Sequence, residues 1–143
     1  MIMGTRHTGI VVENLEVAQN FYLGLGFSVH SEDVEKGRFI EQVTGLDKVK
    51  LKWVKMRLAD GSLLELLQYQ QPAQKQKQTK QLSNKIGVSH VAFTVENIDR
   101  ICEQVVQLGG GLVNEPALSD NHLFKVAYCH DVEGNLFEVV EIQ

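Results

Sequence analysis

Residues 90–98 read His-Val-Ala-Phe-Thr-Val-Glu-Asn-Ile, and the chain contains a second copy of this stretch. The other copy, residues 7–15, reads His-Thr-Gly-Ile-Val-Val-Glu-Asn-Leu. Two further stretches also match each other: residues 60–66 read Asp-Gly-Ser-Leu-Leu-Glu-Leu, and residues 133–139 read Glu-Gly-Asn-Leu-Phe-Glu-Val. Repetition on this scale predicts a duplicated supersecondary module.

Length and charge limit the architecture and the partners. A chain of 143 residues is the size of one domain that buries roughly two thirds of its unfolded surface. We therefore predict a single domain, with module one at residues 5–70, a Gln/Lys-rich linker at 71–86 and module two at 87–143. The net charge of −4 gives no electrostatic footprint for nucleic acid or an anionic membrane.

Cysteine usage and hydropathy predict a cytoplasmic protein. The two cysteines, Cys102 and Cys129, do not form a Cys-x-x-Cys motif, which favours a reducing compartment. Nothing at the N-terminus resembles a secretory signal, and no apolar stretch approaches the ~20 residues of a membrane span.

Module one predicts a strand, a helix and three further strands. Asn14 is the expected N-cap of the helix, and Asp60-Gly61 is a hairpin turn signal. In the third strand apolar and charged residues alternate, and the alternation shifts by one residue after Trp53. This shift predicts a bulge there. The charged residues 31–36 are expected to form a loop, and residues 39–43 a strand or a short helix. The predicted strands are 6–12, 27–30, 48–58 and 62–69, and the predicted helix is 15–25.

Module two repeats this order. Asn97 is the expected cap of a helix through Leu108, residues 116–121 are expected to form a loop, and residues 133–135 a turn. The predicted strands are 88–95, 112–113, 124–130 and 136–142. Two βαβββ modules predict an α+β fold with curved mixed sheets, whose helices cover one face. The other face is then free to line a cleft.

Strand periodicity places four polar side chains on that face. His7 begins the first strand of module one, and Glu65 lies in its last strand; His90 and Glu138 have the same places in module two. If a pseudo-twofold axis relates the modules, both His/Glu pairs can converge on one point. Two imidazoles and two carboxylates suit Zn²⁺, Ni²⁺, Co²⁺, Mn²⁺ or Fe²⁺. The sequence thus predicts a metal-binding cleft.

Each of these residues also has a plain structural interpretation. A histidine that starts a strand is commonly a surface or core residue, and a glutamate in an apolar strand can face solvent. The repetition of the pair favours the metal site, because a carboxylate among apolar neighbours is costly without a partner.

These motifs resemble the vicinal oxygen chelate superfamily, which includes glyoxalase I, methylmalonyl-CoA epimerase, extradiol dioxygenases, fosfomycin-resistance enzymes and metal-free bleomycin-binding proteins. The residues that carry the resemblance are His7 with 12–15, 21–22 with 25–27, Gly61 with 64–66, 90–93, and Asp131 with 134–138. The resemblance implies that His7, Glu65, His90 and Glu138 are the four metal ligands.

The resemblance favours a glyoxalase-like branch. Dioxygenases and fosfomycin enzymes use two His and one Glu, and epimerases usually have Gln at the position of Glu65. Glyoxalase I of bacterial type has an arginine for glutathione where this chain has Val11, so glutathione use is not implied. The family also builds its site across subunits, so a homodimer is expected.

The expected activity is that of a lactoylglutathione lyase-like lyase or isomerase, which removes a proton beside a carbonyl in a small substrate with vicinal oxygens. Glu138 or Glu65 would accept the proton. The alternatives are an epimerase, an extradiol dioxygenase and a metal-free binding or resistance protein. Other polar candidates are weaker: His30 and His122 read as solvated or strand-flanking residues, and His130 as a turn residue.

Overall fold

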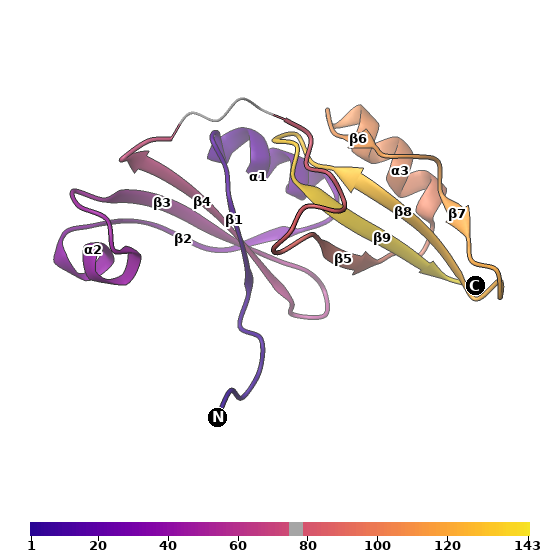
Figure 1. Cartoon of the computed structure of the whole chain (residues 1–143), viewed down its shortest axis with the longest axis horizontal. Helices are drawn as coiled ribbons and strands as arrows, with labels where there is room; N and C mark the ends of the chain where they lie inside the picture. Colours follow the sequence, from indigo (N-terminus) through magenta and orange to yellow (C-terminus); the bar gives the residue numbers. More distant parts are fainter. Residues whose placement is uncertain (75–78) are drawn as a thin grey trace. The chain divides into compact units, whose positions relative to one another are not determined.

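The computed structural model describes residues 1–74 and 79–143. The chain divides into two compact units, Met1–Lys77 and Gln78–Gln143 (Figure 1). The predicted linker, 71–86, includes residues 75–78, which lie outside the described residues. The boundaries of the two modules and the linker stay a prediction.

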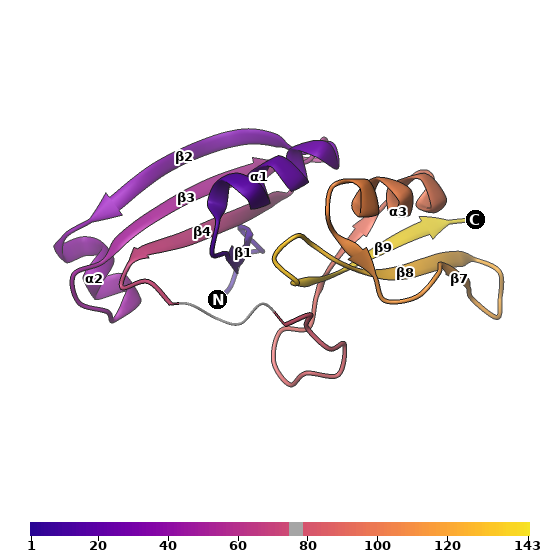
Figure 2. The ribbon, with the colours of Figure 1, turned by 90° about the horizontal axis from the view of Figure 1, so that it is seen from above.

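The first unit is a four-stranded sheet with two helices. Its strand order is β1-β4-β3-β2; β1 runs parallel to β4, and the other neighbours are antiparallel (Figure 1). Helix α1 packs on β3 and β4, and α2 lies near the end of the sheet (Figure 2). The elements are β1 (Thr8–Val11), α1 (Leu15–Gly24), β2 (Ser28–Lys36), α2 (Arg38–Thr44), β3 (Lys50–Arg57) and β4 (Leu63–Gln71).

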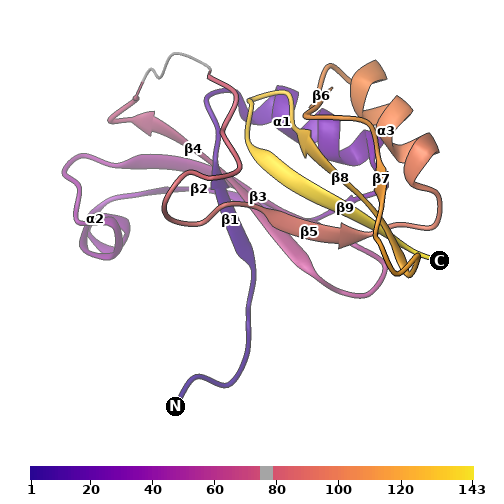
Figure 3. The same cartoon turned by 45° about the vertical axis from the view of Figure 1, so that its right-hand side comes forward.

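The second unit repeats the same connectivity. Its strand order is β5-β9-β8-β6, with β7 also paired to β8, and β5 runs parallel to β9. Helix α3 packs on β6, β8 and β9 (Figure 3). The α+β fold of two βαβββ-like modules is therefore confirmed. The elements are β5 (Val91–Thr94), α3 (Ile98–Gln107), β6 (Gly111–Leu112), β7 (Ala117–Leu118), β8 (Phe124–His130) and β9 (Leu136–Ile142).

Both predicted helix caps are present. The side chain of Asn14 accepts a hydrogen bond from the backbone N of Val17 at 3.2 Å, and Asn97 accepts one from Arg100 at 2.9 Å. Each cap satisfies a backbone N–H that the first helical turn leaves unpaired. No helix within residues 1–74 and 79–143 is long and apolar enough to cross a membrane.

Helices α1 and α3 each bury an apolar stripe against the sheet of their own unit. In the first unit Phe21 and Tyr22 of α1 are at most 2% exposed, and their rings meet edge to face with centroids 5.2 Å apart. In the second unit Ile98 and Val105 of α3 are fully buried, as is Val139 of β9 at 1% exposure. The face of each sheet that α1 or α3 covers is therefore core.

The charged segment 31–36 is part of a strand, so the predicted loop is wrong. Strand β2 continues to Lys36 and pairs with β3 along its length. It is an edge strand of its sheet, where charged side chains remain exposed and discourage pairing with other chains. Residues 39–43 belong to α2 and are helical.

The predicted bulge near Trp53 is also wrong. The β3–β4 register runs without a break from Leu51 opposite Tyr69 to Arg57 opposite Leu63, and the irregularity lies between Lys50 and Leu51. The alternation of apolar residues shifts because α2 covers one face of β3 and α1 covers the other face at a different point along the strand. Leu51 packs with Ile40 of α2 on one face, whereas Val54 and Met56 are buried on the other face, which α1 covers.

One shorter segment also differs from expectation, and one residue of the predicted linker is bonded to the second unit. The predicted loop 116–121 contains β7, whose two residues pair with β8. Gln81, in the predicted linker, is bonded to the second unit: its N–H donates to the carbonyl of Gly134 at 3.0 Å, and its own carbonyl is 2.8 Å from Nε2 of His130. Its side-chain amide donates to the carbonyl of Ser89 at 2.7 Å. Gln81 is therefore tied to this unit through its backbone as well as its side chain.

The buried carboxylate of Asp131 should contribute strongly to stability. Its Oδ1 accepts from the backbone N of Glu133 at 2.9 Å and of Asn135 at 2.8 Å, and the residue is 3% exposed. We expect Asp131→Ala to lower the free energy of unfolding in urea by about 2–4 kcal/mol, because two partly buried backbone N–H donors lose a charged acceptor. Asp60→Ala is the matched control, since Asp60 makes the same kind of turn in an exposed position. Equal losses in the two variants would contradict this account.

Candidate functional site

The first unit brings His7 and Glu65 together. Gly9 of β1 lies opposite Glu65 of β4 in a parallel pairing, and His7 precedes Gly9 by two residues, so its side chain lies on the same face. Nε2 of His7 is 2.9 Å from Oε2 of Glu65, with the side chains 28% and 12% exposed. A Cβ at Gly9 would lie 3.2 Å from Leu67, so a larger residue would crowd this face.

The second unit builds the same pair. Ala92 of β5 lies opposite Glu138 of β9, and Nε2 of His90 is 2.8 Å from Oε2 of Glu138. The other ring nitrogen of His90, Nδ1, is 3.1 Å from Oγ of Ser89. The ring of Tyr128 meets the His90 ring edge to face, with centroids 4.9 Å apart.

The hydrogen bonds fix how each imidazole can act. In each pair a neutral ring donates Nε2–H to the carboxylate; to bind a metal through Nε2, the ring must carry its proton on Nδ1. Ser89 is placed to accept that proton's hydrogen bond from His90. Nδ1 of His7 is buried and has no hydrogen-bond partner among the described residues.

The donor atoms fit a borderline divalent metal. Each pair contributes one imidazole nitrogen and one carboxylate oxygen, the ligands that Zn²⁺, Ni²⁺, Co²⁺, Mn²⁺ and Fe²⁺ accept. Within residues 1–74 and 79–143, no group of three or more His, Cys, Asp or Glu is placed to hold a metal ion. The structure thus places the predicted ligands in two pairs, and the set of four stays a prediction.

A cation that is not among the predicted site residues lies beside the first pair. Nζ of Lys55 in β3 is 3.4 Å from Oε1 of Glu65, and the two residues lie opposite each other in the strand pairing. The hairpin turn at Asp60 nonetheless predicts that Lys55 lies opposite Glu65. A hairpin centred on residue 60 pairs residue 55 with residue 65.

The remaining histidines lie outside both pairs. His30 is exposed, and its Nε2 is 3.0 Å from Nη2 of Arg57. His122 is exposed in a left-handed backbone conformation with φ of 58°. The turn-residue interpretation of His130 is wrong: it is the last residue of β8, 6% exposed, and its Nε2 bonds the carbonyl of Gln81.

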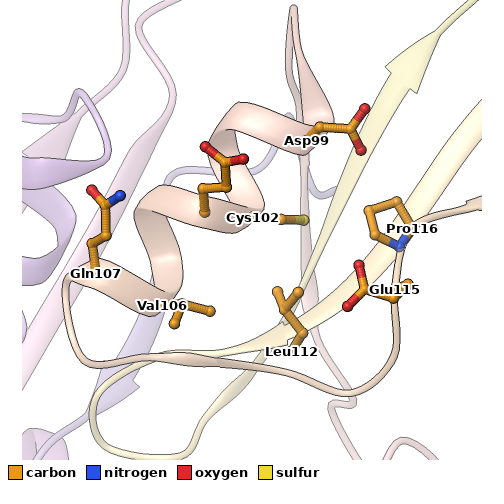
Figure 4. Close-up of a pocket in the computed structure, with 8 residues that line it drawn as sticks. Asp99, Cys102, Val106, Gln107, Leu112, Glu115 and Pro116 are labelled. Carbon is orange, nitrogen blue, oxygen red and sulfur yellow. The ribbon is translucent and has the colours of Figure 1, made fainter.

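The second unit has a hollow of about 470 Å³ on its helix side (Figure 4). It lies between α3 and the segment that follows it, and neither His90 nor Glu138 lines it. Cys102 lies in its wall, and burial raises the pKa of this thiol. Burial also raises the pKa of Cys129 to about 12, so both cysteines are buried apolar groups rather than nucleophiles.

Comparisons with known proteins agree on one family. Residues 4–139 match the model of the Glyoxalase/Bleomycin resistance protein/Dioxygenase superfamily. A glyoxalase family protein from Bacillus cereus has a similar structure, with a TM-score of 0.91 and 28% identity over 99% of this chain and 95% of that one. No curated protein matches the sequence.

Two more distant structures share the fold. A glyoxalase family protein from Enterococcus faecalis has a TM-score of 0.68 and 22% identity over 96% of this chain and 97% of that one. The fosfomycin resistance protein FosX from Listeria monocytogenes, in complex with Mn(II) and sulfate, has a TM-score of 0.62 and 17% identity over 100% and 95%. With the family match spanning nearly all of its residues, the chain belongs to the Glyoxalase/Bleomycin resistance protein/Dioxygenase superfamily.

Proposed function

We propose that this protein is a metal-dependent, glyoxalase-like lyase or isomerase, which removes a proton beside a carbonyl in a small substrate with two vicinal oxygens. The observation that carries the proposal is the duplicated pair. His7 with Glu65 and His90 with Glu138 join the same atoms, Nε2 and Oε2, at 2.9 and 2.8 Å. Structural duplication alone does not require a polar pair in both copies on the face opposite α1 in one unit and α3 in the other.

In this proposal the four side chains hold one divalent metal: Zn, Ni, Co, Mn or Fe. A bound metal would supply Lewis acidity to the two substrate oxygens. The Mn(II) complex of FosX, a protein with the same fold, supports metal binding by this architecture. The ligands come either from one chain or from the two chains of a homodimer.

Glu138 is the better candidate for the base. Glu65 engages both of its oxygens, one with His7 and the other with Lys55. Glu138 uses Oε2 with His90, and its Oε1 forms no hydrogen bond or ion pair within the described part of the chain. A carboxylate with a free oxygen can accept a proton from carbon without losing an existing partner. Glu65 then serves mainly as a ligand.

The substrate in this proposal is small and need not contain glutathione. Val11, where the resemblance places the glutathione arginine, is 61% exposed on β1 and offers no charge. A thioester substrate would instead indicate epimerase activity.

Metal analysis followed by isotope exchange tests the proposal. The protein would be stripped with EDTA, reloaded separately with Zn²⁺, Ni²⁺, Co²⁺, Mn²⁺ or Fe²⁺, and its metal content measured by mass spectrometry. Each form would then be incubated in D₂O with hydroxyacetone, lactaldehyde and methylmalonyl-CoA. We expect deuterium to enter the carbon beside the carbonyl of hydroxyacetone or lactaldehyde, in metal-loaded protein only. Exchange into methylmalonyl-CoA alone would indicate the epimerase instead.

The rival functions give different results in the same experiment. Oxygen uptake with catechol by the Fe²⁺ form, without exchange, would indicate ring cleavage. Absence of metal binding, together with a tightly held organic ligand, would indicate a binding or resistance protein. Either result would overturn the proposed lyase or isomerase.

A further inference from the structure

Lys55 gives the first His–Glu pair a third member. It lies directly opposite Glu65 in the β3–β4 pairing, and its Nζ is 3.4 Å from Oε1. The other oxygen of the same carboxylate is 2.9 Å from Nε2 of His7. Glu65 therefore lies between an imidazole and an ammonium group.

The ammonium group is held in place rather than free in solvent. The Lys55 side chain is 21% exposed, and its Nζ lies 4.3 Å from the centroid of the Trp53 ring. Nε1 of Trp53 donates to Oε1 of Glu35 at 3.0 Å, which fixes the ring. A cation packed over a fixed aromatic face gains cation–π attraction and buries its aliphatic stem.

In the second unit the His–Glu pair forms without a neighbouring cation among the residues that the structure describes. The residue opposite Glu138 is Tyr128, and no lysine or arginine of the described chain forms an ion pair with Glu138. The His90–Glu138 distance of 2.8 Å is nonetheless as short as the one in the first unit. Lys55 is therefore not explained by a need to hold its histidine and glutamate together.

Metal binding would change the charge balance around Lys55. A divalent ion held by His7 and Glu65 would neutralise the carboxylate charge that now faces the ammonium, and its own positive charge would repel the ammonium. A partly buried ammonium with three N–H donors then needs another anion. A substrate that binds the same metal can supply this anion.

We propose that Lys55 is a substrate-binding residue that pairs with an anionic group of the substrate, a carboxylate or a phosphonate adjacent to its metal-binding oxygen. This inference rests on the proposed metal-dependent function. It adds that the substrate is an anion and that the first unit recognises its charge.

Direct binding to Zn²⁺-loaded protein tests Lys55 without any turnover. The probes are glycolate, hydroxymethylphosphonate and glycolamide, which share a hydroxymethyl group and differ in charge. We expect Lys55→Met to raise the Kd of at least one anion by about 10- to 100-fold in calorimetric titrations, the range expected for one charge-assisted hydrogen bond. The Kd of neutral glycolamide should not change. The anion that loses more affinity identifies the group that Lys55 prefers.

Two further variants separate charge recognition from loss of structure. Lys52→Met is the matched control, because Lys52 is a half-buried lysine of the same strand on the opposite face. It should leave all three Kd values unchanged. Lys55→Arg should keep most of the anion affinity. Zn²⁺ should bind Lys55→Met no more weakly than wild type, since no ammonium then competes for Glu65.

The outcomes distinguish this inference from the function on which it rests. Wild-type protein that binds Zn²⁺ but holds the anions no better than Lys55→Met would overturn the role of Lys55 alone. Weaker glycolamide binding by the same factor would also overturn it, because the effect would then not depend on charge. Wild-type protein that binds none of the five metals would overturn the proposed function, and this inference with it.

Discussion

Glu138→Gln should lower the rate of metal-dependent deuterium exchange by about 10²- to 10⁴-fold, the usual contribution of a general base. The amide keeps the size of the carboxylate, and its oxygen can still accept the hydrogen bond from Nε2 of His90, which is 2.8 Å from Glu138 in the wild-type protein. It has no basic oxygen to take a proton from carbon. The fold should therefore persist while the chemistry is lost.

The measurement must separate loss of the base from loss of metal, because Glu138 is also a proposed ligand. Exchange rates would be divided by the metal content of each preparation. Glu103→Gln is the matched control, since Glu103 is an exposed glutamate of α3 that lines the hollow of Figure 4 instead. Full exchange per bound metal in Glu138→Gln would rule out this residue as the base.

Removal of either imidazole should abolish tight metal binding. We expect His7→Ala and His90→Ala each to weaken Zn²⁺ affinity by at least about 100-fold, because the loss of second-shell partners alone costs about 10- to 100-fold. Competition with a chromogenic chelator measures the affinity. His122→Asn is the control: this exposed histidine has a φ of 58°, a backbone conformation that asparagine tolerates. A loss in only one of the two alanine variants would show that the pairs do not share a metal.

A mixture of the two alanine variants decides where the four ligands come from. If each site draws its pairs from different subunits of a dimer, one site per mixed dimer is intact, and roughly a quarter of the wild-type sites should return after refolding together. If each site lies within one chain, no mixture restores a site.

The elements predicted most closely are those where local chemistry and tertiary context agree. The predicted strands 124–130 and 136–142 match β8 and β9, because alternation on both sides of a Gly134-Asn135 turn specifies an antiparallel hairpin. Asn14 and Asn97 mark the helix starts by their capping hydrogen bonds. Such signals depend on neighbouring residues only.

The errors arise where tertiary context overrides local pattern. Residues 31–36 have no apolar stripe, yet they form a strand because β3 supplies the hydrogen-bond partners. Around Trp53, parity alone could not reveal that α2 covers one face of β3 at Leu51. In both cases an element distant in sequence decides the local structure.

The candidate site also combines features that the sequence predicts with features that depend on tertiary packing. Parallel pairing of the first and last strand of a module brings a histidine to the adjacent glutamate, so each pair follows from sequence and topology together. Lys55 is predictable from hairpin register, but its contact with the Trp53 ring depends on the side-chain packing. The convergence of the two pairs on one metal remains a prediction.

The charged edge strand β2 limits how copies of this chain can assemble. If a second copy added its own β2 to this edge, acidic side chains at Glu32, Asp33 and Glu35 would gather along the new seam. Their mutual repulsion opposes a continuous intermolecular sheet. The proposed homodimer should therefore form through another surface, and the same repulsion should keep the protein from forming fibrils along this edge.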